Sequence, residues 1–325
     1  MSGSDIAIIT QERFALAWPE EQARSRTLTE IWIASFKSRH TRTCYRRDLS
    51  RWLDWCIECD TRPDEARKAH TDLWIEKQRR EGAAEASIAR RVSAVASWYD
   101  YLIDNTGDTS SPLVVRNPAK TRARPRIDPD YSPTVGLSRA EADRLIEAAD
   151  KDGRTTSALM RLLLVNGLRV GSAIEARIEN LGYDRGHRVL DLTRKGGYRD
   201  RIAIPPAVGE SIDAMLAWRG SPADGWLFVL RNGRQVYEVW VWRLVRQLAA
   251  LAGIPQADVL SPHSLRATAI TEYLNAGASL AEAQDFARHK DPRTTQRYNK
   301  NRYNLDNHGA YVLAGRYGKR PDDSV

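Results

Sequence analysis

Residues 262–298 read PHSLRATAITEYLNAGASLAEAQDFARHKDPRTTQRY, and this stretch is the most informative part of the chain. It opens with His263 and Arg266, whose spacing places both side chains on one side of a helical turn. It closes with His289 and, further along, Tyr298. Taken singly, these residues fit ordinary interpretations: a solvated helix face, a structural histidine, or one of 12 tyrosines.

A second arginine, Arg169, lies far upstream in the sequence Gly167-Leu168-Arg169, which follows an apolar helical segment. A phosphodiester that approaches a pentacoordinate transition state gains negative charge on its non-bridging oxygens. Guanidinium forks and imidazole donors are suited to hold that charge, and a phenol can supply the attacking oxygen. The ordered set therefore indicates chemistry on a phosphodiester.

This set resembles the tyrosine recombinase (phage integrase) family, and Thr294-Thr295 stands before the tyrosine as in the family's TTxxY ending. The resemblance implies that Arg169 and Arg266 clamp the scissile phosphate. It also implies that His263 shares acid–base duty.

For the two remaining members, the resemblance implies that His289 is a third cationic group that donates to the phosphate. Tyr298 would be the nucleophile that forms a 3′-phosphotyrosyl link. A phenol has a pKa of about 10, so we expect the neighbouring cations to favour its phenolate.

Lys195 belongs to Lys195-Gly196-Gly197, between two segments with a period of two, a pattern that predicts a β-hairpin with a glycine turn. The resemblance gives this lysine the role of general acid toward the leaving 5′ oxygen. A loop lysine that contacts phosphate without proton transfer is the alternative.

Two positions depart from the family pattern. Ser172 stands where an acidic residue is common, with Glu175 the nearest carboxylate, and the family's LGH reads Ala287-Arg288-His289. Both departures affect the expected geometry of the site. Tyr303 is a second tyrosine nearby, and the spacing from His289 favours Tyr298 as the nucleophile.

Composition sets the broad class. The chain has 325 residues, a net charge of +8, 42% hydrophobic residues and 3 cysteines. These values favour a globular protein with two domains and a reducing compartment. The basic charge suits a polyanionic partner such as nucleic acid, but it fits many small cytosolic proteins equally well. Cys56 and Cys59 form a CxxC that lacks further ligands and reads as two half-buried thiols. We expect a soluble, cytoplasmic, nucleoid-associated protein that does not enter a membrane.

The pattern along the chain predicts a mainly α protein with a small β-sheet (α+β). An N-terminal segment, 1–24, precedes a helical bundle at 25–108, which the resemblance identifies as a SAM-like core-binding domain. A basic linker at 109–136, rich in proline and arginine, leads to the catalytic domain at 137–325. Ser138 and Glu141 predict a capping box there, as do Ser279 and Glu282. The tail after Tyr298 is expected to be mostly helical and to dock either on its own domain or on a neighbouring protomer.

Basic residues that could follow a DNA backbone lie on the N-terminal helix and in the linker, although a solvated face explains the helix equally well. The resemblance favours DNA binding, because the family's two domains clamp a duplex from opposite sides. The DNA-binding candidates are Arg39, Arg42, Arg46, Arg47, Arg122 and Arg124.

The resemblance as a whole implies a site-specific DNA recombinase that works as a homotetramer on paired double-stranded sites. An accessory protein that sets the direction of recombination is compatible with this expectation. Because rejoining conserves the energy of the broken bond, we expect no nucleotide cofactor, and no metal is expected either. One alternative is a type IB topoisomerase-like enzyme that nicks and closes DNA. Another is a non-catalytic DNA-binding protein built on the same scaffold.

Overall fold

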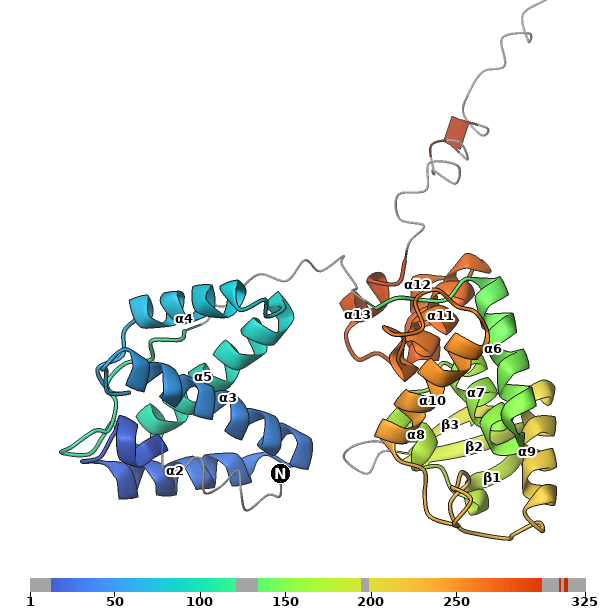
Figure 1. Ribbon diagram of the computed structural model, residues 1–325, viewed down its shortest axis with the longest axis horizontal. Helices are drawn as coiled ribbons and strands as arrows, with labels where there is room; N and C mark the ends of the chain where they lie inside the picture. The colour runs from blue at the N-terminus through green and yellow to red at the C-terminus, as the bar shows by residue number, and fades with distance from the viewer. Residues whose placement is uncertain (1–12, 121–133, 194–198, 300–309, 311–312, 315–325) are drawn as a thin grey trace, which may run out of the picture. The chain divides into compact units, whose positions relative to one another are not determined.

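The computed structural model describes residues 13–120, 134–193, 199–299, 310 and 313–314 (Figure 1). The chain divides into two compact units, residues 1–128 and 129–325. The described residues are mostly helical and include one three-stranded antiparallel sheet. This confirms the predicted class of a mainly α protein with a small β-sheet. Among the described residues, no helix is both long and apolar enough to cross a membrane.

The N-terminal unit contains the four helices expected from apolar periodicity. They are α2 (Gln22–Ser35), α3 (Arg39–Glu58), α4 (Lys68–Arg80) and α5 (Glu85–Thr106). Ser38 begins α3 as its N-cap, where its side chain accepts a hydrogen bond from the Thr41 amide. The apolar stripes of α3 and α5 supply about half of the buried core residues of this unit.

Tryptophans are prominent in that core, and several of their ring N–H groups donate hydrogen bonds inside it. Trp52 Nε1 donates to the Tyr99 hydroxyl at 3.0 Å, and this hydroxyl donates to the Pro63 carbonyl at 2.8 Å. Trp98 Nε1 donates to Thr29 Oγ1 at 2.8 Å. Because each of these buried N–H and O–H groups finds a partner, large aromatic surfaces are buried without the cost of an unsatisfied donor.

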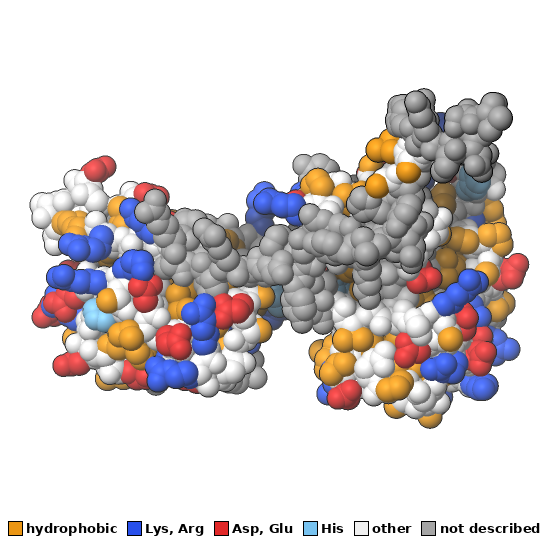
Figure 2. All heavy atoms as spheres, turned by 90° about the horizontal axis from the view of Figure 1, so that it is seen from above, with side chains coloured by type: hydrophobic (Ala, Val, Ile, Leu, Met, Phe, Trp, Pro, Cys, Tyr) orange, Lys and Arg blue, Asp and Glu red, His pale blue; other side chains and the backbone are white. Residues whose placement is uncertain are grey.

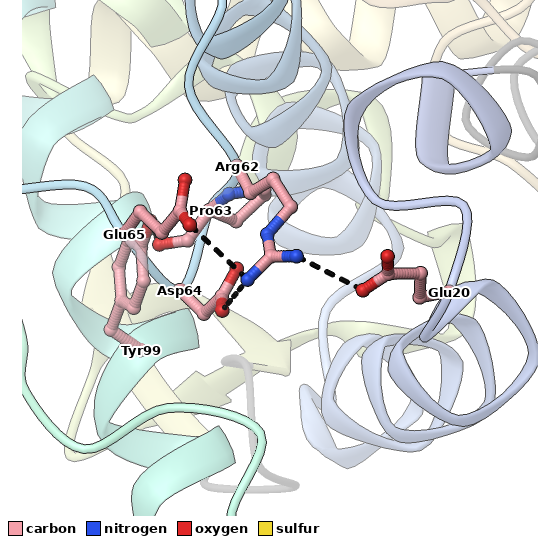
Figure 3. Close-up of polar contacts among 6 residues, drawn as sticks. All are labelled: Glu20, Arg62, Pro63, Asp64, Glu65 and Tyr99. Carbon is pink, nitrogen blue, oxygen red and sulfur yellow. Dashed lines mark hydrogen bonds and ion pairs between the residues drawn. The ribbon is translucent and has the colours of Figure 1, made fainter.

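Arg62 links the loop between α3 and α4 to the segment that precedes α2 through ion pairs (Figure 3). Its guanidinium contacts Glu20 at 2.9 Å and Asp64 at 3.0 Å. The same loop carries Pro63, whose carbonyl is held by the core tyrosine, Tyr99. The loop is therefore fixed from the solvent side and from the core side.

The start of the predicted linker packs into the N-terminal unit. Leu113, Val114 and Ala119 are buried in its core, although the change in composition predicts a linker at 109–136. Asn117 supports this segment, because its amide donates to the Ala96 carbonyl at 2.9 Å. Apolar residues between prolines and polar residues do not show a period, so their burial is not visible in the sequence.

The C-terminal unit begins with α6 (Arg139–Asp152), at the predicted capping box between Ser138 and Glu141. The remaining helical elements follow the order α7 (Arg154–Val165), α8 (Val170–Ile174), η2 (Ile178–Asn180), α9 (Pro206–Trp218), α10 (Glu238–Leu251), α11 (Pro262–Asn275), α12 (Leu280–Ala287) and α13 (Pro292–Gln296). The second predicted capping box, between Ser279 and Glu282, starts α12.

The sheet has the strand order β1 (Leu181–Asp184), β2 (His187–Thr193), β3 (Arg199–Ala203). The β2–β3 pairing confirms the predicted hairpin, with Leu190 opposite Ile202 and both side chains buried. The short strand β1, which contains Gly182, was not predicted, because four residues give too little alternation to recognise. Figure 1 shows the strands in the lower part of this unit and α11, α12 and α13 gathered in its upper part.

Candidate active site

The first turns of α11 carry His263 and Arg266. Ser261 is the N-cap of this helix and exchanges hydrogen bonds with Ser264, while Pro262 occupies the first helical position. This arrangement fixes where the helix begins, and therefore which residues its first turns present. Arg266 points into the interior, with 1% of its surface exposed, whereas His263 is exposed.

The Arg266 guanidinium is held by hydrogen bonds from three directions. Nη1 donates to the Gly167 carbonyl, and Nη2 donates to the Ala287 carbonyl and lies 3.1 Å from His289 Nε2. Its Nε is buried and has no hydrogen-bond partner among the described residues. Burial, followed by the charge of Arg169, lowers the pKa of this guanidinium to about 10, so it remains charged at neutral pH.

Gly167 allows the chain to approach Arg266 closely. Its φ is +55°, and a Cβ there would lie 3.0 Å from the Phe286 ring and 3.3 Å from Ala269 Cβ. Only glycine adopts this conformation at low cost in so little space. The motif Gly167-Leu168-Arg169 therefore has a structural basis: the Gly167 carbonyl accepts a hydrogen bond from Arg266, and Arg169 follows two residues after this glycine.

Arg169 lies at the N-cap position of α8. Its positive charge contributes to lowering the pKa of His263, Arg266 and His289. The structure thus brings Arg169 near three groups that are far from it in the sequence.

His289 follows α12 and lies between Arg266 and Tyr298. Its Nδ1 is 2.9 Å from Thr295 Oγ1, and its ring is nearly parallel to that of Tyr298, with centroids 6.0 Å apart. Burial, followed by the charges of Arg266 and Arg169, lowers the pKa of His289 to about 4. This lowered pKa favours the neutral imidazole at physiological pH in the DNA-free protein. Thr295 belongs to the TTxxY motif, but sequence reasoning gave it no role.

Tyr298 is 6% exposed, and its hydroxyl lies 3.1 Å from His263 Nε2. Burial raises the pKa of the phenol, while the charges of Arg266, Arg169 and Arg297 oppose that rise. The cations therefore act in the expected direction, but burial outweighs them. The pKa of His263 is lowered by loss of hydration and by the charges of Arg266 and Arg169, which favours its neutral form.

Arg288, where the family commonly has glycine, adopts the left-handed conformation with φ of 53° at the end of α12. Glycine suits this position because a Cβ is strained there. Arg288 Nε forms an ion pair with Asp200 Oδ2 at 2.8 Å, and the two side chains are only 15% and 20% exposed. This ion pair links the turn before His289 to the start of β3, and it offsets the local strain.

The two partners should differ in their effect on stability. Asp200→Ala removes the ion pair and leaves the strained arginine, so we expect it to lower the free energy of unfolding by about 1–3 kcal/mol. Arg288→Gly removes the same ion pair but relieves backbone strain of about 1 kcal/mol. Its decrease in the free energy of unfolding should therefore be smaller. Urea unfolding followed by tryptophan fluorescence measures both. A larger loss for the glycine variant would contradict this account.

Several predicted residues lie outside the described part of the chain. These are Lys195, Arg122, Arg124 and Tyr303. Ser172 lies within α8 and Glu175 ends that helix as an exposed C-cap residue. Among the described residues, no three His, Cys, Asp or Glu side chains are grouped in a way that could hold a metal ion.

Two segments of the chain match known protein families. Residues 136–304 match the phage integrase family, and residues 28–106 match the N-terminal SAM-like domain of phage integrases. The chain belongs to the phage integrase family. It is a tyrosine recombinase of the simple two-domain type, and such enzymes cut and rejoin DNA through a tyrosine nucleophile.

Curated relatives match across both units of this recombinase. The tyrosine recombinase XerC of Rhodospirillum centenum is 33% identical over 270 residues, covering 80% of this chain and 77% of that protein. The tyrosine recombinase XerD of Chlorobaculum tepidum is 28% identical over 275 residues, covering 80% of this chain and 86% of its own length. Such similarity over most of the chain supports site-specific recombination over the topoisomerase-like and non-catalytic alternatives.

Solved structures share the fold. XerH site-specific recombinase bound to difH substrate, in a pre-cleavage complex, has a TM-score of 0.69 and 13% identity, covering 95% of this chain and 94% of that one. A lambda integrase dimer bound to a COC′ core site has a TM-score of 0.65 and 18% identity, covering 85% of this chain and 77% of that one.

Proposed function

We propose that this recombinase cleaves DNA with Tyr298, while Arg169 and Arg266 bind the scissile phosphate. The observation that carries the proposal is the contact of the Tyr298 hydroxyl with His263 Nε2, 3.1 Å apart, beside a buried arginine. Arg266 Nε, a buried donor without a hydrogen-bond partner among the described residues, is consistent with this proposal.

The proposed step begins with the phenol proton. Because burial raises the pKa of Tyr298, the phenol is protonated at neutral pH and must lose its proton during attack. Neutral His263 can accept that proton at Nε2. The phenol oxygen then forms a bond to phosphorus, and the bond from phosphorus to the 5′ oxygen breaks. Lys195 is proposed to protonate this leaving oxygen, and the reverse sequence rejoins the strand.

The proposed product of the first step is a 3′-phosphotyrosyl intermediate with a free 5′ hydroxyl. Exchange between two duplexes requires four strand cuts, and each protomer offers one Tyr298 in this scheme. We therefore propose a homotetramer on paired sites. Such a substrate would place the protein with the nucleoid DNA of the cytoplasm.

A covalent capture experiment tests the function and finds the recombination site in the same step. The protein is incubated with a library of nicked duplexes whose flanks are randomised. Because of the nick, cleavage releases a short fragment that diffuses away. The strand then cannot be rejoined, and the covalent adduct is trapped. Sequencing of the captured DNA identifies the site, and peptide mapping identifies the attached residue. We expect the adduct on Tyr298, and an adduct on Tyr303 would move the nucleophile.

A plasmid assay with the captured sites tests for recombination. Exchange between two sites on one plasmid supports the tetrameric recombinase, and exchange by the purified protein alone shows that no accessory protein is required. Efficient relaxation of a supercoiled plasmid without a captured site would instead favour the topoisomerase-like alternative.

The N-terminal unit is proposed to contact the DNA backbone through α3 and α5. On the face drawn in Figure 2, Lys and Arg side chains lie among Asp and Glu side chains on both units. The distribution of charge on that face therefore does not identify a binding surface. Two of the predicted arginines make contacts within the unit. Arg46 forms an ion pair with Glu30, and Arg42 Nε donates to the Phe36 carbonyl at 2.8 Å.

Around the buried carboxylate of Asp48 lies an α3–α5 arginine cluster, which consists of Arg47, Arg51, Arg90 and Arg91. Burial, followed by the charges of the other three, lowers the pKa of Arg91. Guanidinium groups that repel one another would be stabilised by a polyanion. Arg47, which was predicted to bind DNA, therefore belongs to a larger candidate phosphate-binding surface formed by this cluster.

Neutralising two exposed members of the cluster should weaken DNA binding in a salt-dependent way. For Arg47→Gln combined with Arg51→Gln, we expect the slope of log affinity against log salt to fall by about 2, close to one unit per lost phosphate contact. Titration of captured duplex at several salt concentrations measures this slope. Arg79→Gln is the control, because Arg79 pairs with Glu85 at 2.7 Å. An unchanged slope in the double variant would exclude the cluster from the interface.

A further inference from the structure

The ion pair between Arg288 and Asp200 joins two parts of the C-terminal unit that are remote in the sequence. Arg288 Nε lies 2.8 Å from Asp200 Oδ2, and both side chains are largely shielded from water. Asp200 is the second residue of β3 and lies opposite Leu192 of β2, whereas Arg288 is the C-cap residue of α12. Because a shielded ion pair is screened less than an exposed one, this contact can hold the two elements in register.

On one side, the ion pair is anchored to the surroundings of Arg266. Arg288 directly follows Ala287, whose carbonyl accepts a hydrogen bond from Arg266 Nη2. The Arg288 N–H donates to the Asp285 carbonyl at 3.0 Å, so its backbone is also held to α12. After burial and the charge of Arg169, the charge of Arg288 lowers the pKa of Arg266 as well, so the two guanidinium groups lie close enough to interact. Arg288 therefore extends from a segment that Arg266 holds in place.

On the other side, the ion pair reaches the end of the β2–β3 hairpin at which the turn begins. Lys195 comes two residues after β2 ends at Thr193 and four residues before β3 begins at Arg199. The turn at 194–198 lies outside the described residues, but both strands that lead to it are described. At the opposite end of the hairpin, Arg188 forms an ion pair with Asp213 on α9. The hairpin is thus held at both ends.

We propose that Arg288 and Asp200 are positioning residues for Lys195. Arg266 holds the end of α12, Arg288 holds Asp200, and β3 carries the position of Asp200 to the turn. The proposal rests on the proposed function, in which Lys195 protonates the leaving 5′ oxygen. It gives a catalytic consequence to Arg288, which stands where the family commonly has glycine.

The leaving group provides a readout that a merely structural role would not change. When the bond from phosphorus to the 5′ oxygen breaks, Lys195 donates a proton to that oxygen and becomes a neutral amine. If sulfur replaces the bridging oxygen, the bond from phosphorus to sulfur breaks and a thiolate leaves. Thiols have a pKa of about 8.5, so this thiolate needs no proton from the protein. A defect in proton donation should therefore disappear on the sulfur substrate, whereas a defect in attack or phosphate binding should remain.

Lys195→Ala calibrates the measurement on two versions of a captured nicked duplex, one with bridging oxygen and one with bridging sulfur. We expect it to cleave the oxygen substrate about 10²–10⁴-fold more slowly in a single turnover, the range for loss of a general acid. It should cleave the sulfur substrate at close to the parental rate. Equal losses on both substrates would reject Lys195 as the general acid, and the positioning proposal would fall with that part of the proposed function.

Asp200→Asn then tests the positioning itself, because it removes the charge and nearly keeps the shape of the side chain. We expect it to cleave the oxygen substrate about 10–100-fold more slowly, as for a displacement of about 1 Å, and the sulfur substrate within about threefold of the parent. The matched control is Asp191→Asn. Asp191 pairs with Arg201 at 2.7 Å within the same hairpin, so its loss should leave both rates at the parental level.

A double-mutant cycle shows whether Arg288 and Asp200 act through one contact. We expect Arg288→Gln to lose as much on the oxygen substrate as Asp200→Asn, and the double variant to lose no more than either, since a shared contact is lost only once. Losses that multiply in the double variant overturn the pair. A slow Arg288→Gln beside an unaffected Asp200→Asn would make Arg288 a direct DNA contact and would also overturn it.

The oxygen-to-sulfur comparison separates this proposal from the proposed function. If Lys195→Ala is rescued by sulfur but Asp200→Asn is slowed equally on both substrates, the positioning role fails and the general acid stands. Urea unfolding followed by tryptophan fluorescence shows whether each variant is folded in the assay buffer. If Asp200→Asn is unfolded there, Arg288→Gln decides by the same comparison of the two substrates.

Discussion

Replacing Tyr298 by Phe is expected to abolish covalent attachment to nicked DNA while leaving DNA affinity unchanged. The variant keeps the buried ring against His289 and removes only the oxygen that contacts His263. The loss of one partly buried hydrogen bond costs about 0.5–1.5 kcal/mol, so the protein should still fold. Without the phenol oxygen, no phosphotyrosyl bond can form, and the yield of adduct on a captured nicked duplex should fall below detection.

Tyr303→Phe is the matched control for this experiment, since it removes the same atom from the neighbouring tyrosine. It should form the adduct at the parental level. Adduct formation by Tyr298→Phe, together with its loss in Tyr303→Phe, would show that the nucleophile lies five residues further along the chain.

Arg266→Lys is expected to reduce the cleavage rate by at least about 10²–10³-fold, the range found when one donor to a charged transition state is removed. An ammonium cannot reproduce the planar fork that reaches Gly167, Ala287 and His289 together. Single-turnover cleavage at saturating DNA measures the effect, because saturation separates chemistry from binding. The control is Arg293→Lys, at an exposed arginine that pairs with Asp291.

The same substitution should also reduce stability. Two buried carbonyl oxygens, those of Gly167 and Ala287, lose a charged donor. Each unsatisfied group costs about 1–3 kcal/mol, so we expect a clear decrease in the free energy of unfolding by urea. A variant with parental cleavage and parental stability would refute both the clamp and the packing role of Arg266.

Much of the architecture was accessible from the sequence because the relevant signals are local. Apolar periodicity located α3 and α5, and capping boxes at Ser138 and Ser279 located the starts of two helices. Alternation with a period of two located β2 and β3. The short strand β1 and the burial of Leu113 were not predicted from the sequence, since each depends on contacts with distant segments rather than on its own pattern.

Candidates for the site could also be named from their order in the sequence, but the contacts between them could not. Sequence spacing does not show that Arg288 takes the left-handed conformation, or that Asp200 on β3 pairs with it. It does not show that Arg46 is engaged by Glu30. These facts depend on which side chains approach one another after the chain has folded.

The sequence by itself determined the fold class, the family and the identity of the nucleophile and clamp candidates, because helical periods, caps and an ordered set of residues are properties of the chain. Only the tertiary structure decided how those groups are protonated. Burial outweighs the arginine charges at Tyr298 and raises its pKa, and burial together with the charges of Arg266 and Arg169 lowers the pKa of His289. Protonation depends on local hydration and on the nearest donor, and both are set by distances between residues that are remote in sequence.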